Sequence, residues 1–174
     1  TYLHSGDVVY DVGANFGFFS LIAAKRVGPA GCVYAFEPVS ENVLSINTNS
    51  GLNLITNIRT FEVAVGSKTR KGEMLLTEWD GGATLSTSAN TPAVPLSRRK
   101  VCVVALDDII KEKNLSPPSF VKIDVEGSEL DVIQGMSKTI TNSRPVLLYE
   151  IDDQDKDSFD RRWQNIDRCI MDFK

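Results

Sequence analysis

The stretch Val8-Val9-Tyr10-Asp11-Val12-Gly13-Ala14-Asn15-Phe16-Gly17 decides the fold of this chain. Its first half joins valines to a tyrosine, and branched and aromatic side chains suit a buried, pleated strand. Its second half contains two glycines, which let the backbone turn sharply and let a ligand approach it closely. An apolar run follows Gly17, which predicts a helix whose N-terminal amides point at whatever binds on the turn.

Asp11 indicates which kind of ligand the turn would bind. A dinucleotide site has the pattern G-x-G-x-x-G, whereas three residues separate Gly13 from Gly17 here and Asn15 stands where a second glycine would be. A carboxylate at this strand end would repel a pyrophosphate and attract a cation. We therefore interpret the turn as a site for S-adenosylmethionine, which carries an amino group and a sulfonium.

Length and composition are those of an ordinary globular chain. The 174 residues are 42% hydrophobic and 24% charged, so we expect one core and a single domain over residues 1–174. A net charge of −4 argues against a nucleic-acid surface, which requires concentrated Lys and Arg. No apolar run has the length of a membrane span, and three cysteines and one histidine show no metal or disulfide spacing. We expect a cytoplasmic protein with no metal site, while the oligomeric state is not predicted.

Strands and helices alternate along the chain. The order strand, helix, strand, helix, strand over residues 8–65 predicts a parallel sheet with right-handed crossovers. We therefore expect an α/β fold: a Rossmann-like, doubly wound, mostly parallel sheet in a three-layer α/β/α arrangement. The strands expected in this sheet cover residues 8–12, 32–36, 61–65, 120–124 and 146–150.

The region between the third and fourth of these strands is less regular. Residues 74–76 and 101–105 predict short strands, and Asp107 is expected to cap a short helix. Residues 79–99 are rich in Gly, Ser, Thr, Asn and Pro, and they are too many for a mere connector. We expect this stretch to be a lid over a site or a flexible loop.

Acidic residues stand at or next to the carboxyl ends of four strands, where a doubly wound sheet binds its ligand: Asp11, Glu37, Asp124 and Glu150. Such a gathering is repulsive unless a cation or hydroxyl donors lie between the carboxylates. Glu37 follows the glycine turn by roughly the 20 residues at which an acid accepts ribose hydroxyls. The alternative is that Glu37 is only an exposed strand-end carboxylate and Asp11 only a cap of the turn.

Asp124 and Glu126 are the candidates for the substrate side of the site. The helix dipole alone favours acids in a first helical turn, which explains Glu126 in part but not Asp124, at the end of a buried strand. Lys122, in the same strand, is interpreted as ion-paired or edge-facing rather than as a base. Ala64 suits the lining of an adenine ring, although such residues more often belong to a core.

Three motifs together resemble the FkbM-type methyltransferases, which have the class I S-adenosylmethionine-dependent fold: Asp11-Val-Gly13-Ala-Asn15-Phe-Gly17, Phe36-Glu37-Pro38, and Lys122-Ile-Asp124-Val-Glu126-Gly127-Ser-Glu129. The resemblance runs from about Gly6 to Ile151. It implies methyl transfer from S-adenosylmethionine to an oxygen, typically a hydroxyl of a sugar or natural product. The family pattern implies that the glycine turn (Asp11, Gly13, Asn15 and Gly17) holds the methionine end and Glu37 the ribose, with Asp124 and Glu126 at the reaction centre.

Departures from the family pattern and rival functions remain open. Class I domains usually close with a strand hairpin after the fifth strand, and we expect this chain to lack it. One rival is an NAD-linked oxidoreductase, which shares the strand, turn and helix. Another is a catalytically silent nucleotide-binding or scaffold domain, and a third variant is a metal-assisted enzyme in which Asp124 ligates magnesium.

Overall fold

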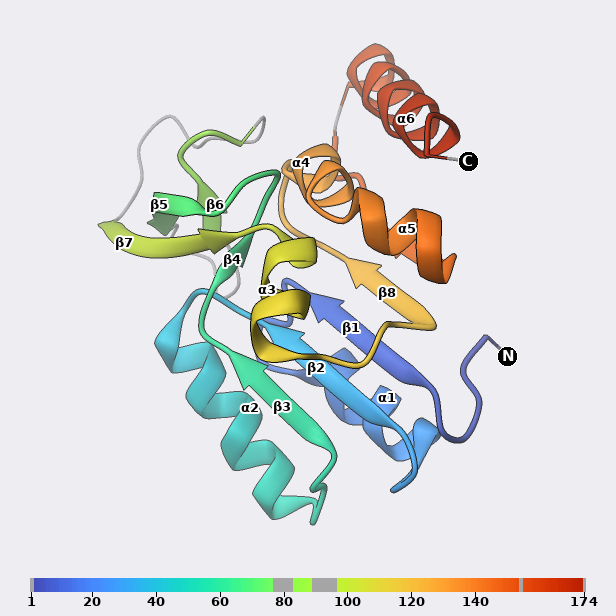
Figure 1. Ribbon diagram of the computed structural model, residues 1–174. Coiled ribbons are helices and arrows are strands. Elements are labelled where there is room, and N and C mark those ends of the chain that lie inside the picture. The colour runs from blue at the N-terminus through green and yellow to red at the C-terminus, as the bar shows by residue number, and fades with distance from the viewer. Residues whose placement is uncertain (1, 77–82, 89–96, 154, 174) are drawn as a thin grey trace.

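The computed structural model describes residues 2–76, 83–88, 97–153 and 155–173 (Figure 1). Its helices and strands, in chain order, are β1 (Val8–Val12), α1 (Phe18–Val27), β2 (Cys32–Phe36), α2 (Ser40–Leu52), β3 (Ile58–Phe61), β4 (Ala64–Val65), β5 (Arg70–Leu76), β6 (Ala83–Leu85), β7 (Ser97–Val104), α3 (Leu106–Lys113), β8 (Phe120–Ile123), α4 (Glu129–Gln134), α5 (Ser137–Ser143), β9 (Val146–Tyr149) and α6 (Lys156–Met171).

The central sheet has five strands in the order β3-β2-β1-β8-β9, and every neighbouring pair is parallel. The chain moves outward from β1 through β2 to β3 and then returns to the other side of β1 with β8. Strand order therefore reverses beside β1, where sheets of this kind bind ligands. The register places Asp11 of β1 directly between Ala35 of β2 and Lys122 of β8.

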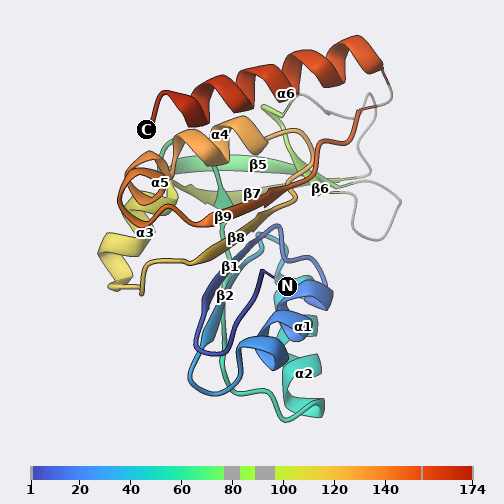
Figure 2. The same ribbon diagram turned by 90° about the vertical axis from the view of Figure 1, so that its right-hand side faces the viewer.

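Helices cover both faces of this sheet, as Figures 1 and 2 show. Side chains alternate along β1, so Val9 packs with α1 on one face while Tyr10 and Val12 belong to the core beneath α3, α4 and α5. Helix α6 lies over α4, and its Ile166 is 1% exposed within the same core. The predicted three-layer, Rossmann-like α/β/α arrangement is confirmed.

A second, four-stranded sheet has the order β4-β7-β5-β6 and corrects one expected strand. The predicted third strand, residues 61–65, is divided between two sheets: β3 ends at Phe61 and β4 pairs with β7. The division lies at Val63, whose N–H donates to the carbonyl of Phe61 and so turns the chain out of the central sheet. The short strands predicted at 74–76 and 101–105 belong to β5 and β7, which pair in antiparallel fashion.

Two further expectations concern the lid at residues 79–99 and the strand hairpin after the fifth strand. Residues 79–82 and 89–96 of the expected lid lie outside the described residues, whereas 83–85 form β6 and 97–99 begin β7. Helix α6 follows β9, and within the described ranges no additional strand joins the central sheet beside β9. No helix in the described part of the chain has both the length and the apolar character that crossing a membrane requires.

The prediction that Asp107 caps its own helix is wrong. Helix α3 begins after Ala105, so Asp107 already lies in the first turn. Its carboxylate instead accepts hydrogen bonds from the N–H groups of Lys138 (2.9 Å) and Thr139 (3.0 Å) and from the Thr139 hydroxyl (2.7 Å). Those amides are unsatisfied at the start of α5, whose own N-cap position is Met136 and makes no side-chain bond.

Two glycines fix the place where the second sheet meets the helical layer. A Cβ atom added to Gly135, between α4 and α5, would lie 2.1 Å from the carbonyl oxygen of Gly66. Gly66 donates its N–H to Val104 at the end of β7 (2.9 Å), and the Gly135 carbonyl accepts from the N–H of Asp107 (3.0 Å). Main chain therefore packs directly on main chain at this corner.

Candidate active site

A pocket opens at the carboxyl edge of the central sheet, beside the point where strand order reverses. Its lining comes from the turn after β1, the end of β2, helix α2, the β3–β4 connection, the second sheet and the turn after β8. The lining residues are Gly13, Asn15, Phe36, Glu37, Pro38, Asn42, Val63, Ala64, Val65, Met74, Ala83, Leu85, Asp124, Val125 and Glu126.

The pocket brings together most of the residues that the sequence predicted for the site. Six of them line it: Gly13, Asn15, Glu37, Ala64, Asp124 and Glu126. Asp11, within β1, and Gly17, at the end of the turn, are not part of the lining. Two further parts of the lining were not predicted from the sequence: Asn42 on α2, and an apolar wall from the second sheet formed by Met74, Ala83 and Leu85.

The turn after β1 is shaped by two left-handed glycines. Gly13 has φ +78° and Gly17 has φ +86°. A Cβ atom on Gly13 would lie 1.8 Å from the carbonyl oxygen of Asp124, and one on Gly17 would lie 2.8 Å from Ile46. Asn15, between them, has φ +49°, and its buried Oδ1 has no hydrogen-bond partner among the described residues. The positive φ of the two glycines thus lets the turn pass close to the backbone after β8 and to helix α2.

Glu37 is a buried carboxylate, 4% exposed, at the end of β2. It accepts hydrogen bonds from the N–H of Asn15 (2.9 Å), the N–H of Val39 (2.9 Å) and the side-chain amide of Asn42 (3.2 Å). Burial raises the pKa of Glu37, and these three donors oppose that rise. A carboxylate has about four lone-pair sites, so one remains for a ligand hydroxyl in the pocket.

Asp11 is fully buried beneath the turn. Its Oδ2 accepts a hydrogen bond from the Ser20 hydroxyl of α1 (2.6 Å), while its Oδ1 has no hydrogen-bond partner among the described residues. Burial raises the pKa of Asp11, and the ammonium of Lys122, 3.7 Å from Oδ1, opposes that rise. The cation that pairs with Asp11 inside this fold is therefore a lysine of the protein.

Lys122 also pairs with Asp124, and its interpretation as an ion-paired residue is confirmed. Its Nζ lies 2.9 Å from Oδ2 of Asp124 and 5.7 Å from the centre of the Phe19 ring. One ammonium thus stands between the carboxylates that end β1 and β8. It supplies the cation without which these two strand-end acids would repel each other.

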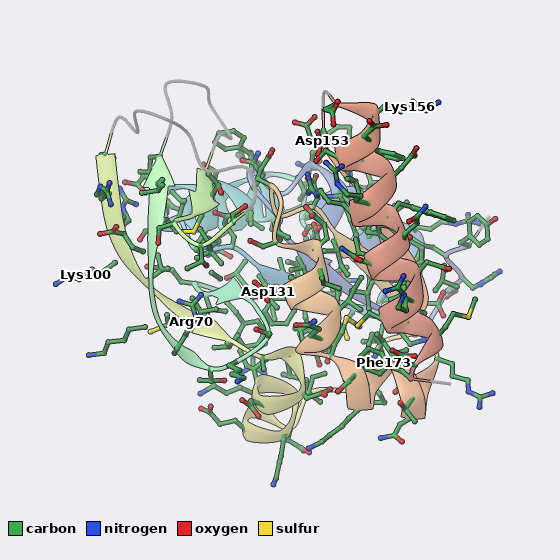
Figure 3. The ribbon with its side chains drawn as sticks, turned by 90° about the horizontal axis from the view of Figure 1, so that it is seen from above. Arg70, Lys100, Asp131, Asp153, Lys156 and Phe173 are labelled. Carbon is green, nitrogen blue, oxygen red and sulfur yellow. The ribbon has the colours of Figure 1, made fainter. Side chains whose placement is uncertain are left out.

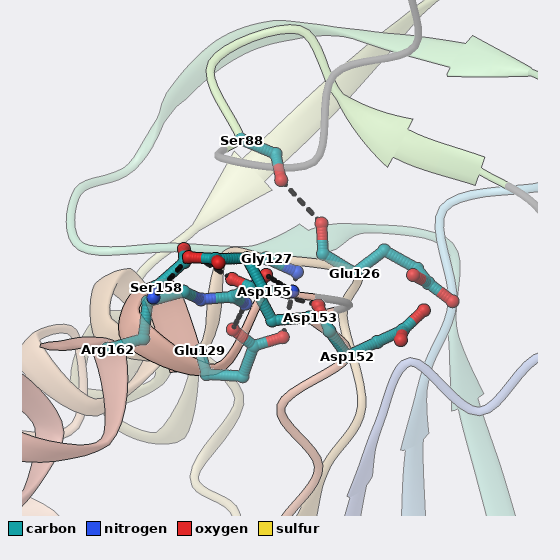
Figure 4. A network of polar contacts seen from close by, with 9 residues as sticks. All are labelled: Ser88, Glu126, Gly127, Glu129, Asp152, Asp153, Asp155, Ser158 and Arg162. Atoms are coloured by element: carbon teal, nitrogen blue, oxygen red, sulfur yellow. Dashed lines mark hydrogen bonds and ion pairs between the residues drawn. The ribbon is translucent and has the colours of Figure 1, made fainter. Parts of the chain in front are cut away.

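Glu126 follows Asp124 in a strained turn, with φ +50°. Its carbonyl oxygen accepts hydrogen bonds from the hydroxyls of Ser88 and Thr84, in the β6 region. Figure 4 shows its carboxylate and that of Asp152 directed toward one another. Burial raises the pKa of Glu126, and the neighbouring carboxylates of Asp124, Asp152, Glu129 and Glu150 raise it further.

The second sheet forms a wall of the pocket. Its inner face carries Met74 and Leu85, which pack with Ala64 and Val103 in one buried cluster. An exposed ion pair between Arg99 of β7 and Glu41 of α2 joins this sheet to the opposite side of the pocket. Among the described residues, no group of three or more His, Cys, Asp or Glu side chains is arranged to hold a metal ion.

The central sheet and its flanking helices define a Rossmann-like α/β protein, the fold that solved methyltransferase structures share. The chain belongs to the FkbM methyltransferase family, because the family model described as "Methyltransferase FkbM domain" matches residues 11–171.

Characterised relatives and a solved structure agree with this assignment. The chain is 28% identical over 160 residues to 31-O-demethyl-FK506 methyltransferase FkbM of Streptomyces tacrolimicus, covering 77% of this chain and 61% of that protein. It is 25% identical over 142 residues to hexuronic acid methyltransferase AglP of Haloferax volcanii, covering 82% of this chain and 55% of that protein. The crystal structure of methyltransferase FkbM from Methylobacillus flagellatus has the same fold, with a TM-score of 0.56 and 23% identity over 82% of this chain and 32% of that one. The chain thus spans less than two thirds of the length of each.

Proposed function

We propose that this chain binds S-adenosylmethionine and transfers its methyl group to a hydroxyl of a small molecule or glycan. One observation carries the proposal: a single pocket joins the glycine turn and Glu37 on one side to Asp124 and Glu126 on the other. The family to which the chain belongs supports it. So do the relatives, whose names describe methylation of a hexuronic acid and of a demethylated natural product.

The residues present fit this cofactor. Glu37 has a lone pair left for a ribose hydroxyl, and Asn15 lines the pocket beside it. The apolar surface of Ala64, Met74 and Leu85 suits an adenine ring. S-Adenosylmethionine supplies a methyl group on a sulfonium, which is already a good leaving group. The protein's main contribution is then alignment, which can lower a barrier by about 7–11 kcal/mol.

Glu126 is the general base of the proposed reaction. S-Adenosylmethionine would supply the methyl group to the acceptor oxygen and leave as S-adenosylhomocysteine, and the Glu126 carboxylate would take the proton that the hydroxyl loses. Asp124 is already engaged by the Lys122 ammonium, whereas Glu126 is surrounded by carboxylates that favour proton uptake. A positioned base of this kind typically contributes ~10²–10⁴ to the rate.

The first experiment tests the cofactor. The full chain is titrated calorimetrically with S-adenosylhomocysteine and, separately, with NAD⁺, and its melting temperature is measured with each. We expect S-adenosylhomocysteine alone to bind and raise the melting temperature, because a ligand of the folded state stabilises it by mass action. Binding of NAD⁺ alone would support the oxidoreductase, and binding of neither would support a silent scaffold.

Two matched variants test whether the cofactor binds in this pocket. Glu37→Gln removes the buried carboxylate, and we expect weaker S-adenosylhomocysteine binding by roughly tenfold, the effect of about 1.4 kcal/mol. Glu62→Gln alters an exposed carboxylate that bonds only Ser40 in the described structure and serves as the control. Equal affinities of the two variants for S-adenosylhomocysteine would show that Glu37 does not contribute to cofactor binding.

Transfer itself is measured with methyl-labelled S-adenosylmethionine and a panel of methyl glycosides and uronic acids. Glu126→Gln is expected to lower turnover by ~10²-fold or more while leaving cofactor affinity near that of the wild type. Asp124→Asn distinguishes the two acids. If Asp124→Asn loses turnover but still binds the cofactor, and Glu126→Gln remains active, then Asp124 is the base.

A further inference from the structure

Helix α6 inserts one arginine toward the candidate active site. Figure 3 shows Asp153 and Lys156 near the start of this helix and Phe173 beyond its other end. Arg162, in its second turn, has a side chain that is only 15% exposed. One guanidinium nitrogen, Nη2, donates to Oε2 of Glu129 (2.7 Å), while Nη1 donates to the carbonyl of Asp152 (2.9 Å) and lies 3.4 Å from Oδ2 of Asp153.

Glu129 connects Arg162 to the turn that carries Glu126, because its carboxylate bonds both. Its carboxylate is 3% exposed, and its other oxygen, Oε1, accepts the N–H of Gly127 (2.8 Å). Gly127 is the residue directly after Glu126. The Arg162 guanidinium therefore reaches the backbone beside Glu126 through one carboxylate, and the backbone of Asp152 directly (Figure 4).

These two backbone points lie at or next to two acids: Glu126, which lines the pocket, and Asp152, whose carboxylate lies near that of Glu126 in Figure 4. The turn after β8 carries Glu126, and the segment between β9 and α6 carries Asp152. Each segment is held to the same planar guanidinium, whose donors lie in a fixed geometry. The guanidinium of α6 thus links the backbones of the two segments that carry these acids.

We propose that Arg162 is a positioning residue, which holds the turn of Glu126 and the segment of Asp152 in the arrangement that methyl transfer requires. This inference rests on the function proposed above. Arg162 does not line the pocket, so it acts through Glu129 and the Asp152 backbone.

Helix α6 also docks through apolar side chains. Ile166 of the helix is buried in the main core, with Cys169 and Ile170 packed against that core. An exposed neighbour, Arg161, has no ion pair among the described residues. Arg161→Met is thus a matched control for Arg162→Met: the same side chains are exchanged in the same helix, with and without the contacts to the turn.

The test compares the wild type, Arg162→Met, Arg161→Met and Arg162→Lys as full chains saturated with S-adenosylhomocysteine. Hydrogen exchange of the Gly127 amide is followed by NMR. We expect Arg162→Met to exchange this amide at least about tenfold faster, because Glu129 loses the partner that fixes it, while Arg161→Met matches the wild type. Arg162→Lys keeps the charge but lacks the planar fork, and we expect an intermediate rate.

Turnover on an acceptor found with the wild type provides the second readout. We expect Arg162→Met to lower kcat about tenfold or more, since small displacements of reacting groups are costly, while the Kd for S-adenosylhomocysteine stays within about twofold. An unchanged Gly127 exchange rate in Arg162→Met would overturn the inference even if no acceptor is known. Loss of kcat matched by an equal loss of cofactor affinity would also overturn it. Failure of the wild type to bind S-adenosylhomocysteine would instead count against the proposed function.

Discussion

The ammonium of Lys122 lies 2.9 Å from a carboxylate oxygen of Asp124 and 3.7 Å from one of Asp11, so a single cation joins the ends of β1 and β8. Asp11 has no exposed surface and Lys122 very little. Because neighbouring strands place these groups side by side, the charge beneath the glycine turn is balanced within the fold. The contact with Lys122 also orients the Asp124 carboxylate at the pocket.

Replacement of this cation should destabilise the protein. Lys122→Met leaves Asp11 buried without its partner, and breaking such a pair typically costs 3–5 kcal/mol. The partial exposure of Asp124 places our expectation at the low end, about 3 kcal/mol. Urea unfolding measures the loss, with Lys122→Arg as the charge-conserving variant and Lys111→Met as an exposed control. An unfolding midpoint equal to that of the wild type would show that the pair contributes nothing.

The pH dependence of turnover should report the Glu126 carboxyl. Its pKa is raised above the ordinary 4.5, and the base must be ionised to accept a proton. Activity is therefore expected to rise with pH through a midpoint above 4.5, and Glu126→Gln should abolish that limb of kcat/KM. A limb that survives in Glu126→Gln with the same midpoint would identify another group as its origin.

The same carboxyl predicts a stability difference of known sign. A pKa raised by folding means that the folded state binds the proton more tightly than the unfolded state. The resulting stabilisation is fully present below the unfolded pKa and is lost as pH rises through the higher folded pKa. The stability of the wild type relative to Glu126→Gln should therefore fall as the pH rises above the ordinary pKa of 4.5, measured by urea unfolding at a series of pH values. A relative stability that rises over this range would contradict the direction given for Glu126.

Two glycines offer a matched pair of alanine substitutions. A Cβ atom on Gly13 meets the Asp124 carbonyl at 1.8 Å, whereas one on Gly51, in α2, meets nothing within 4 Å. We expect Gly13→Ala to lose S-adenosylhomocysteine binding and several kcal/mol of stability, through a steric clash and an unfavourable φ. Gly51→Ala should gain about 0.5–1 kcal/mol, the helical advantage of alanine. Calorimetric binding and thermal unfolding measure both, and normal binding by Gly13→Ala would mean that the strand ends separate easily.

Asp107 provides a test of the helical layer. Asp107→Ala removes the carboxylate that caps α5 from a different helix, and loss of a cap costs about 0.5–2 kcal/mol. Glu112→Ala, at an exposed position of α3, serves as the control. Thermal unfolding of the two variants measures the difference. Equal melting temperatures would mean that water replaces the Asp107 contacts at no cost.

Local sequence pattern was sufficient for four of the five strands of the central sheet and for six of the fifteen residues that line the pocket. The strand, glycine turn and helix around Gly13 follow from residues that are neighbours in sequence, and Glu37 and Asp124 follow from their positions at strand ends. The wall formed by Met74 and Leu85 did not follow, because a strand pattern does not identify its pairing partner. β4 pairs with β7 across a long segment of chain, and such non-local pairing leaves no local signal.

The charges of the site were also only partly predictable. A carboxylate at the end of β1 suggested attraction for a cationic ligand, and the fold supplies Lys122 as a cation for it. The alternation of side chains along β1 and β8 places Asp11 and Lys122 on one face. Their pairing required knowledge that these two strands are neighbours. The Arg162 contact is still less accessible from sequence, because it depends on how α6 lies over α4.

The contact between Gly66 and Gly135 has a practical consequence for protein engineering. Because backbone rests on backbone at that corner, the second sheet has one point of attachment that does not involve the side chains of the apolar wall. Shortening Met74 or Leu85 should enlarge the cavity for bulkier cofactor analogues without disturbing that attachment. The penalty is the usual loss on truncating a buried side chain, about 2–5 kcal/mol for each alanine.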